Sequence, residues 1–158
     1  MTSDTINNKH RPAQVLLVED NYGDILLTRR AFADAKISND LHVAASGEEA
    51  VEMLYKKGAW ENSPTPDLIL LDLNLPGMSG QDVLKLIKQD DLLKKIPVVI
   101  LSSSKADQDV VKSYNLHANG YVVKPVSLEN FSEVVQKLEQ FWFSLVVLPC
   151  PSADESDM

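Results

Sequence analysis

Residues 68–77 read LILLDLNLPG, and this segment guides the interpretation of the whole chain. It begins with four large aliphatic residues and closes on Pro76 and Gly77. A continuous apolar run of this length is typical of a strand that is buried on both faces of a parallel sheet. The run ends on Asp72, and ligands bind beyond the carboxyl ends of the strands in open α/β sheets. An isolated Asp at this point is more often a helix cap or a turn residue, so Asp72 becomes a candidate site residue only together with the polar residues at other strand ends.

The size and composition of the chain indicate one globular domain. The 158 residues are 44% hydrophobic and 24% charged, which suffices for a single core and leaves no room for a second. We expect a disordered leader over residues 1–12, a folded domain over residues 13–149 that includes an apolar C-terminal extension, and a disordered acidic tail over residues 150–158.

The charge balance excludes some classes of function. The formal net charge is -8, which argues against binding to nucleic acid, because duplex affinity depends on Lys and Arg that neutralise phosphates. The acidic balance favours a cation site or a basic protein partner. No signal peptide is visible, no apolar run has the length of a membrane span, and the single cysteine rules out an internal disulfide. We therefore expect a soluble cytoplasmic protein that does not bind a membrane.

Strand and helix patterns alternate along the chain. Strands are expected at residues 14–18, 41–45, 68–71, 97–101 and 120–123. Helices are expected near residues 22–36, 79–91 and 107–116, with another entered through the capping-box pattern of Ser46 and Glu49 and a last one running from its cap at Ser127 to Trp142. This alternation predicts a doubly wound α/β fold, in which helices cover both faces of a five-stranded parallel sheet through right-handed crossovers.

Polar residues follow four of these strands at their carboxyl ends. They are Glu19 and Asp20 after the first strand, Asp72 after the third, Ser102 after the fourth and Lys124 after the fifth. Because these ends share one edge of the sheet, we expect the side chains to lie close together. Three carboxylates held together raise one another's pKa unless a cation lies among them, and oxygen ligands suit Mg²⁺.

This set of residues predicts a phosphoryl-transfer site. Asp72 would be the nucleophile that becomes an aspartyl phosphate, while Lys124 and Ser102 would stabilise the phosphoryl oxygens. For Mg²⁺, we expect Asp20 and Asp72 as ligands, Glu19 acting through water or at longer reach, and the backbone carbonyl of Asn74 as a further oxygen. The chain has no glycine-rich phosphate loop, which indicates that another protein rather than a nucleotide donates the phosphoryl group.

The chain resembles the receiver domains of two-component response regulators, the CheY-like family. The resemblance rests on residues 19–20, 71–72 with 76–80, Ser102, and the segment YVVKP at residues 121–125. The resemblance covers residues 14–141. It implies a flavodoxin-like (β/α)5 fold with strand order 2-1-3-4-5, a histidine kinase that phosphorylates Asp72, and a phosphoprotein that catalyses only its own phosphotransfer and dephosphorylation. It also implies an aromatic switch at Tyr121, which moves as Ser102 turns toward the phosphate. Glu19 stands where Asp is commoner in this family, and Ser102 where Thr is frequent, but each keeps the needed oxygen.

Three segments are similar to a narrower group, the phytochrome-associated response regulators of cyanobacteria and other bacteria. They are residues 71–76, 113–119 and 141–149. This resemblance implies a stand-alone receiver whose kinase is a phytochrome, and the alternative is a stand-alone receiver that serves another kinase.

Two other functions remain open at this point. One is a phosphorylation-independent pseudo-receiver that acts as a dimeric adaptor. The other is an aspartyl-nucleophile phosphatase, a class that commonly carries a second Asp two residues after the nucleophile. That position is Asn74 in this chain, which makes the phosphatase the weaker alternative.

The apolar extension after the last helix predicts an interface. Phe141, Trp142, Phe143 and Leu145 would form a larger exposed apolar patch than soluble monomers usually carry. We expect this extension and the region of the fourth and fifth helices to pack on a partner in a twofold homodimer, as the resemblance also implies. The alternative is that the extension folds back on its own domain.

Overall fold

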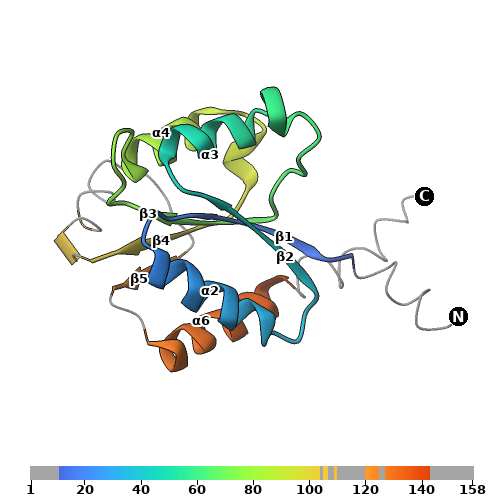
Figure 1. Ribbon diagram of the computed structural model, residues 1–158, viewed down its shortest axis with the longest axis vertical. Helices are drawn as coiled ribbons and strands as arrows, with labels where there is room; N and C mark the ends of the chain where they lie inside the picture. The colour runs from blue at the N-terminus through green and yellow to red at the C-terminus, as the bar shows by residue number, and fades with distance from the viewer. Residues whose placement is uncertain (1–10, 104, 107–108, 110–119, 125–126, 143–158) are drawn as a thin grey trace, which may run out of the picture.

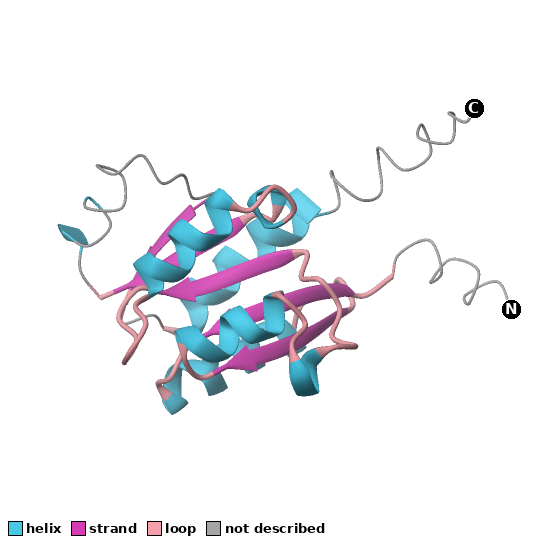
Figure 2. Ribbon diagram, turned by 90° about the horizontal axis from the view of Figure 1, so that it is seen from above, coloured by secondary structure: helices cyan, strands magenta, loops and turns pink. Residues whose placement is uncertain are grey.

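The computed structural model describes residues 11–103, 105–106, 109, 120–124 and 127–142, with Phe141 and Trp142 described by their backbone only. Five strands form one sheet in the order β2-β1-β3-β4-β5, and every neighbouring pair is parallel. Figure 2 shows the strand arrows pointing the same way. The strands are β1 (Ala13–Val18), β2 (Asn39–Ala44), β3 (Leu68–Asp72), β4 (Val98–Ser102) and β5 (Gly120–Val123). The predicted fold class and strand order are confirmed.

Helices cover both faces of this sheet. They are α2 (Tyr22–Ala33), α3 (Gly47–Leu54), α4 (Gly80–Gln89) and α6 (Leu128–Trp142), with short 3-10 turns at Gly58–Trp60 and Leu93–Lys95. In Figure 1, α3 and α4 lie above the sheet, and α2 and α6 lie below it. None of the described helices combines the length and apolar character that crossing a membrane requires. The helix predicted at residues 107–116 falls largely outside the described residues.

The apolar run in β3 is explained by this two-sided cover. Ile69 and Leu71 belong to the core beneath α3 and α4, whereas Leu68 and Leu70 belong to the core beneath α2 and α6. All four side chains are buried. Successive strand residues point to opposite faces, so a central strand with helices on both sides needs apolar residues at every position.

The first helix and the second strand differ from their predicted boundaries. The helix α2 ends at Ala33 rather than near residue 36, and β2 starts at Asn39 rather than at residue 41. The Asn39 side-chain amide donates hydrogen bonds to the carbonyls of Phe32 (2.9 Å) and Ile37 (3.0 Å). This side chain satisfies a carbonyl at the end of the helix and fixes the turn into the strand, an arrangement that hydrophobic periodicity does not reveal.

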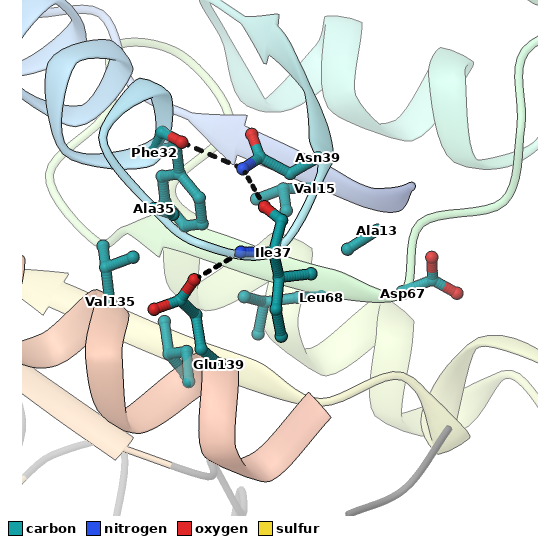
Figure 3. Close-up of a pocket in the computed structure, with 11 residues that line it drawn as sticks. Ala13, Val15, Phe32, Ala35, Ile37, Asn39, Asp67, Leu68, Val135 and Glu139 are labelled. Carbon is teal, nitrogen blue, oxygen red and sulfur yellow. Dashed lines mark hydrogen bonds between the residues drawn. The ribbon is translucent and has the colours of Figure 1, made fainter. Parts of the chain in front are cut away.

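The amino ends of the strands enclose a small apolar cavity, which Figure 3 shows. It is lined by residues that include Val15, Phe32 and Leu68, and the Ile37 N–H donates a 2.7 Å hydrogen bond to Glu139 Oε2 beside it. Its volume of about 40 Å³ has room for only a few water molecules. Drug-sized ligands occupy several hundred cubic ångströms, so the cavity is a packing gap rather than a binding site.

The start of α4 packs directly against β3. A Cβ atom on Gly80 would lie 2.1 Å from the carbonyl oxygen of Asp72 and 2.6 Å from Cα of Leu73. The Gly80 N–H also donates to the Leu73 carbonyl at 3.2 Å. Only glycine permits this approach of two backbones, and it fixes where the loop after Asp72 rejoins a helix.

We predict that Gly80→Ala lowers the free energy of unfolding by about 3 kcal/mol, because the added methyl group must displace backbone atoms. Urea denaturation measures this loss. Gly120→Ala is the matched control, since the nearest atom to its new Cβ would be a Val99 methyl at 3.7 Å. The control is expected to change stability by less than about 1 kcal/mol. Equal losses in the two variants would contradict the assigned contact.

Candidate functional site

The carboxyl edge of the sheet brings the predicted site residues together. Glu19 and Asp20 directly follow β1, while Asp72 and Ser102 are the last residues of β3 and β4. Lys124 directly follows β5, and its backbone N–H donates a 2.7 Å hydrogen bond to the Ser102 carbonyl. Parallel pairing therefore aligns the ends of strands that are distant in sequence.

Three carboxylates form a compact cluster at this edge. Glu19, Asp20 and Asp72 each contribute one oxygen, and these oxygens lie within 4.8 Å of one another. Glu19 and Asp72 are buried, whereas Asp20 is exposed. Two of the three charges are thus held away from water, where their mutual repulsion is strong.

The ammonium of Lys124 lies against this cluster. Its Nζ atom is 2.8 Å from Glu19 Oε1, 3.0 Å from Glu19 Oε2 and 3.3 Å from Asp72 Oδ2. A third carboxylate, that of Asp24, is 2.9 Å away. The lysine therefore offsets part of the negative charge of the two buried acids.

The surroundings shift the pKa values of both Glu19 and Lys124. Burial raises the pKa of Glu19 to about 7, against the lowering effect of the hydrogen bond from Lys124, and the charge of Asp72 raises it further. Burial alone would lower the pKa of Lys124, but its hydrogen bonds to Glu19 and Asp24 and the charge of Asp72 raise it instead. The lysine is consequently a permanent cation, while Glu19 exchanges its proton near neutral pH.

The carboxylate of Asp72 is oriented by the loop that follows it. Its Oδ1 accepts a 3.0 Å hydrogen bond from the Asn74 N–H, and the Asn74 side chain donates to Ser103 Oγ at 2.9 Å. Glu48, in the first turn of α3, accepts a 3.0 Å hydrogen bond from the Met78 N–H at the far side of the loop. The loop is thus anchored by a neighbouring helix as well as by β3.

Ser102 and Tyr121 lie on adjacent strands. Ser102 is fully buried at the end of β4, and Tyr121 on β5 pairs with Ile100 and packs partly buried against the core beneath α3 and α4. Burial raises the pKa of the Tyr121 hydroxyl.

The residues of the predicted interface lie at or beyond the end of the described chain. Phe143 and Leu145 fall outside the described residues, and only the backbone of Phe141 and Trp142 is described, at the end of α6.

Sequence reasoning missed Asp24. It lies in the first turn of α2, and its N–H donates a 2.9 Å hydrogen bond to the side chain of the N-cap residue Asn21. An acidic residue there is ordinary helix chemistry, so the residue type gave no signal. The informative feature was its position, because a helix that starts directly after Glu19 and Asp20 places its first turn beside the site.

The donor set fits a hard divalent cation. Glu19 Oε1 is fully buried and accepts no well-directed hydrogen bond from the described residues, although the Lys124 ammonium is in contact with it. Buried oxygens with spare acceptor capacity, grouped with two further carboxylates, are ligands typical of Mg²⁺ or Mn²⁺. The residues that could hold such an ion are the three clustered acids.

Comparison with known proteins agrees with this geometry. Residues 15–147 match the family model for the response regulator receiver domain. The chain is 44% identical over 138 residues to response regulator Rcp1 of Synechocystis sp. (strain ATCC 27184 / PCC 6803 / Kazusa), covering 87% of this chain and 94% of that protein.

Solved structures give the same result. The phosphorylated cyanobacterial phytochrome response regulator RcpA superposes with a TM-score of 0.77 at 42% identity, covering 88% of this chain and 99% of that one. The Mn²⁺-bound form of Rcp1 superposes with a TM-score of 0.75 at 43% identity, covering 88% and 100%. The fold, the acidic cluster with its lysine and these matches lead to one conclusion: the chain belongs to the response regulator receiver domain family.

Proposed function

We propose that this protein is a stand-alone response regulator that accepts a phosphoryl group on Asp72 from the phosphohistidine of a histidine kinase. The observation that carries the proposal is the Lys124 ammonium, which lies 3.3 Å from Asp72 Oδ2 within a cluster of three carboxylates. A buried aspartate with a permanent cation beside it and a cation site around it is suited to covalent phosphotransfer.

The transfer is a balanced displacement. A carboxylate oxygen of Asp72 attacks phosphorus, an O–P bond forms, and the N–P bond to the donor histidine breaks with the imidazole as leaving group. Lys124 and the Ser102 hydroxyl stabilise the phosphoryl oxygens as negative charge spreads over them. The protein acts as phosphoacceptor and promotes only its own phosphorylation and dephosphorylation.

Mg²⁺ is the proposed cofactor. Asp20, Asp72 and Glu19, the last directly or through water, would hold it together with the backbone carbonyl of Asn74. When bound, it supplies electrostatic stabilisation of the phosphoryl group. The solved Rcp1 structure with Mn²⁺ supports a divalent cation in this family.

The kinase partner is proposed to be a phytochrome. The support is the similarity to the cyanobacterial phytochrome response regulator RcpA and to the bacteriophytochrome response regulator AtBRR, each 42% identical to this chain. The alternative partner is a histidine kinase with another sensor. Phosphotransfer would be compared between phosphorylated kinases with and without a phytochrome sensor.

We further propose that phosphorylation shifts a two-state equilibrium at Ser102 and Tyr121. The two residues lie on neighbouring strands, and the backbone hydrogen bond between Lys124 and Ser102 links the ends of those strands. Movement of the Ser102 hydroxyl toward a phosphoryl oxygen would favour one arrangement of the Tyr121 ring, which a partner then recognises.

Incubation with Mg²⁺ and acetyl phosphate is expected to add one phosphoryl group, measured by intact-mass spectrometry. Asp72→Asn or removal of Mg²⁺ by chelation should abolish the adduct, because the nucleophile or the charge stabilisation is lost. Lys124→Met should slow loading roughly 100-fold, in line with the loss of one transition-state stabilising group.

Asp67→Asn is the matched control for this experiment. Asp67 lies just before the other end of β3 and pairs with Arg11 at 2.8 Å, so the variant should load like the wild type. If folded, Mg²⁺-bound wild-type protein takes up no phosphoryl group, the dimeric adaptor becomes the better assignment.

The pKa of Glu19 predicts how cation binding depends on pH. Glu19 must lose its proton before it binds a cation, and its pKa is raised to about 7. Lowering the pH from about 7.5 to about 5.5 is therefore expected to weaken Mn²⁺ binding roughly 20-fold in isothermal titration calorimetry. In Glu19→Gln this titrating group is absent, and the pH dependence should largely disappear. The same pH dependence in both proteins would show that another group controls binding.

We also propose a homodimer formed through the C-terminal extension, including Phe141, Trp142, Phe143 and Leu145. The support is the apolar sequence of the extension. A separate observation is that Val123, on the edge strand β5, is 52% exposed. Exposed apolar groups on an edge strand favour association.

The double variant Phe141→Glu/Phe143→Glu is expected to weaken dimerisation at least about 100-fold, because charges would enter the apolar contact. Sedimentation equilibrium measures the change. The control is Leu92→Glu, which alters a residue 80% exposed just after α4, on the opposite face of the sheet. A wild-type protein that is monomeric at high concentration would contradict the dimer and favour an extension folded on its own domain.

A further inference from the structure

Asp24 holds the Lys124 ammonium from outside the three-carboxylate cluster. Its Oδ2 is 2.9 Å from Nζ, closer than the 3.3 Å between Nζ and Asp72. Both polar groups of the Asp24 backbone are hydrogen-bonded. The N–H donates to Asn21 Oδ1, and the carbonyl accepts a 2.7 Å hydrogen bond from the buried Thr28 hydroxyl. The Asp24 carboxylate is therefore presented to the lysine from a rigid helix start.

The positions of the charges create a conflict inside the site. Lys124 contacts Glu19 and Asp72, which are two of the three acids available to a divalent cation. An ion bound about 2.1 Å from those oxygens would lie close to the ammonium, and the two positive charges would repel each other. Cation binding is therefore easier when the ammonium has a partner outside the cluster.

In the described part of the chain, Asp24 is the one carboxylate that pairs with Lys124 without belonging to the cluster. A small cavity lined by Asp24, Leu27, Leu101 and Lys124, among others, borders the lysine on this side. The 2.9 Å distance from Nζ to Asp24 Oδ2 is already that of a charge-assisted hydrogen bond, so the lysine can keep this pair without moving into packed groups.

We propose that Asp24 is a positioning residue, which takes over the Lys124 ammonium when a divalent cation occupies the Glu19, Asp20 and Asp72 cluster. The lysine then stays within reach of Asp72, ready to pair with an incoming phosphoryl oxygen, and does not compete with the cation for the same carboxylates. This inference rests on the proposed function, because it assumes that the cluster binds a divalent cation.

A simpler role for Asp24 is to stabilise the positive N-terminus of α2. Asp82 offers a direct comparison, because its N–H donates to the N-cap side chain of Ser79 at 3.1 Å in the first turn of α4. It forms no ion pair with Lys124 among the described residues. Asp82→Asn therefore reproduces the loss of an acidic residue at a helix start without touching the lysine.

The test is a double-mutant cycle on Mn²⁺ affinity, measured by calorimetry at about pH 8, where Glu19 is largely ionised. The proteins are wild type, Asp24→Asn, Lys124→Met and the double variant, with Asp82→Asn as control. In the protein that keeps Lys124, Asp24→Asn is expected to weaken Mn²⁺ binding roughly three- to ten-fold. In the Lys124→Met background, the same substitution is expected to weaken it less than about two-fold. The control is expected to bind Mn²⁺ like the wild type.

Two results would overturn the inference. The first is an unchanged Mn²⁺ affinity of Asp24→Asn in the protein that keeps Lys124. The second is a loss of affinity by the same factor in both backgrounds, which would indicate a general charge effect. Thermal unfolding of each variant verifies that the domain is folded. If the wild type itself binds no Mn²⁺, the proposed cofactor fails first, and that outcome is distinct from an additive cycle in a wild type that binds.

Discussion

The contact between the Lys124 ammonium and the buried carboxylates of Glu19 and Asp72 is the interaction on which the rest of the site depends. Two acids at the end of a sheet, both removed from water, repel each other strongly in a medium of low dielectric. Lys124 directly follows β5 and lies 105 residues after Glu19 in the sequence, so the charges are balanced only when the sheet is complete. Assembly of the fold and assembly of the site are the same event.

The sheet keeps these charged groups at the carboxyl ends of its strands and apolar groups at the amino ends. At the amino ends, apolar side chains and the hydrogen bond between Ile37 and Glu139 surround a small cavity of about 40 Å³. At the carboxyl ends, polar groups follow almost every strand and converge on one cluster. Between them, the strands present apolar residues to both helix layers, and the edge-to-face contact of Phe32 with Phe131 joins α2 to α6. The apolar middle keeps the charged edge rigid.

Much of this arrangement was predictable from the sequence. The run at residues 68–71 specified a doubly covered strand, and the polar residues after successive strands specified a shared edge, because parallel topology leaves no other place for them. The end of α2 and the start of β2 were not predictable, because both depend on the hydrogen bond from the Asn39 side chain to the Phe32 carbonyl. In α3, Ser46 caps the helix as its pattern indicates, yet Glu49 accepts from the Ala45 N–H, one residue before the expected donor. Asp24 escaped notice because its partner is fixed by tertiary structure alone.

The close contact of Gly80 with the Asp72 carbonyl limits which positions of this protein tolerate substitution. Every substitution at Gly80 adds at least a Cβ atom, and that atom falls on the backbone of the site. Even the smallest replacement, alanine, therefore meets this cost, so substitution at Gly80 is penalised from its first step. Variation that adapts the protein to new partners must instead accumulate on exposed positions such as Tyr22, Leu26 and Leu92, where a new side chain meets solvent. The chemistry stays fixed while the outer surface is free to diversify.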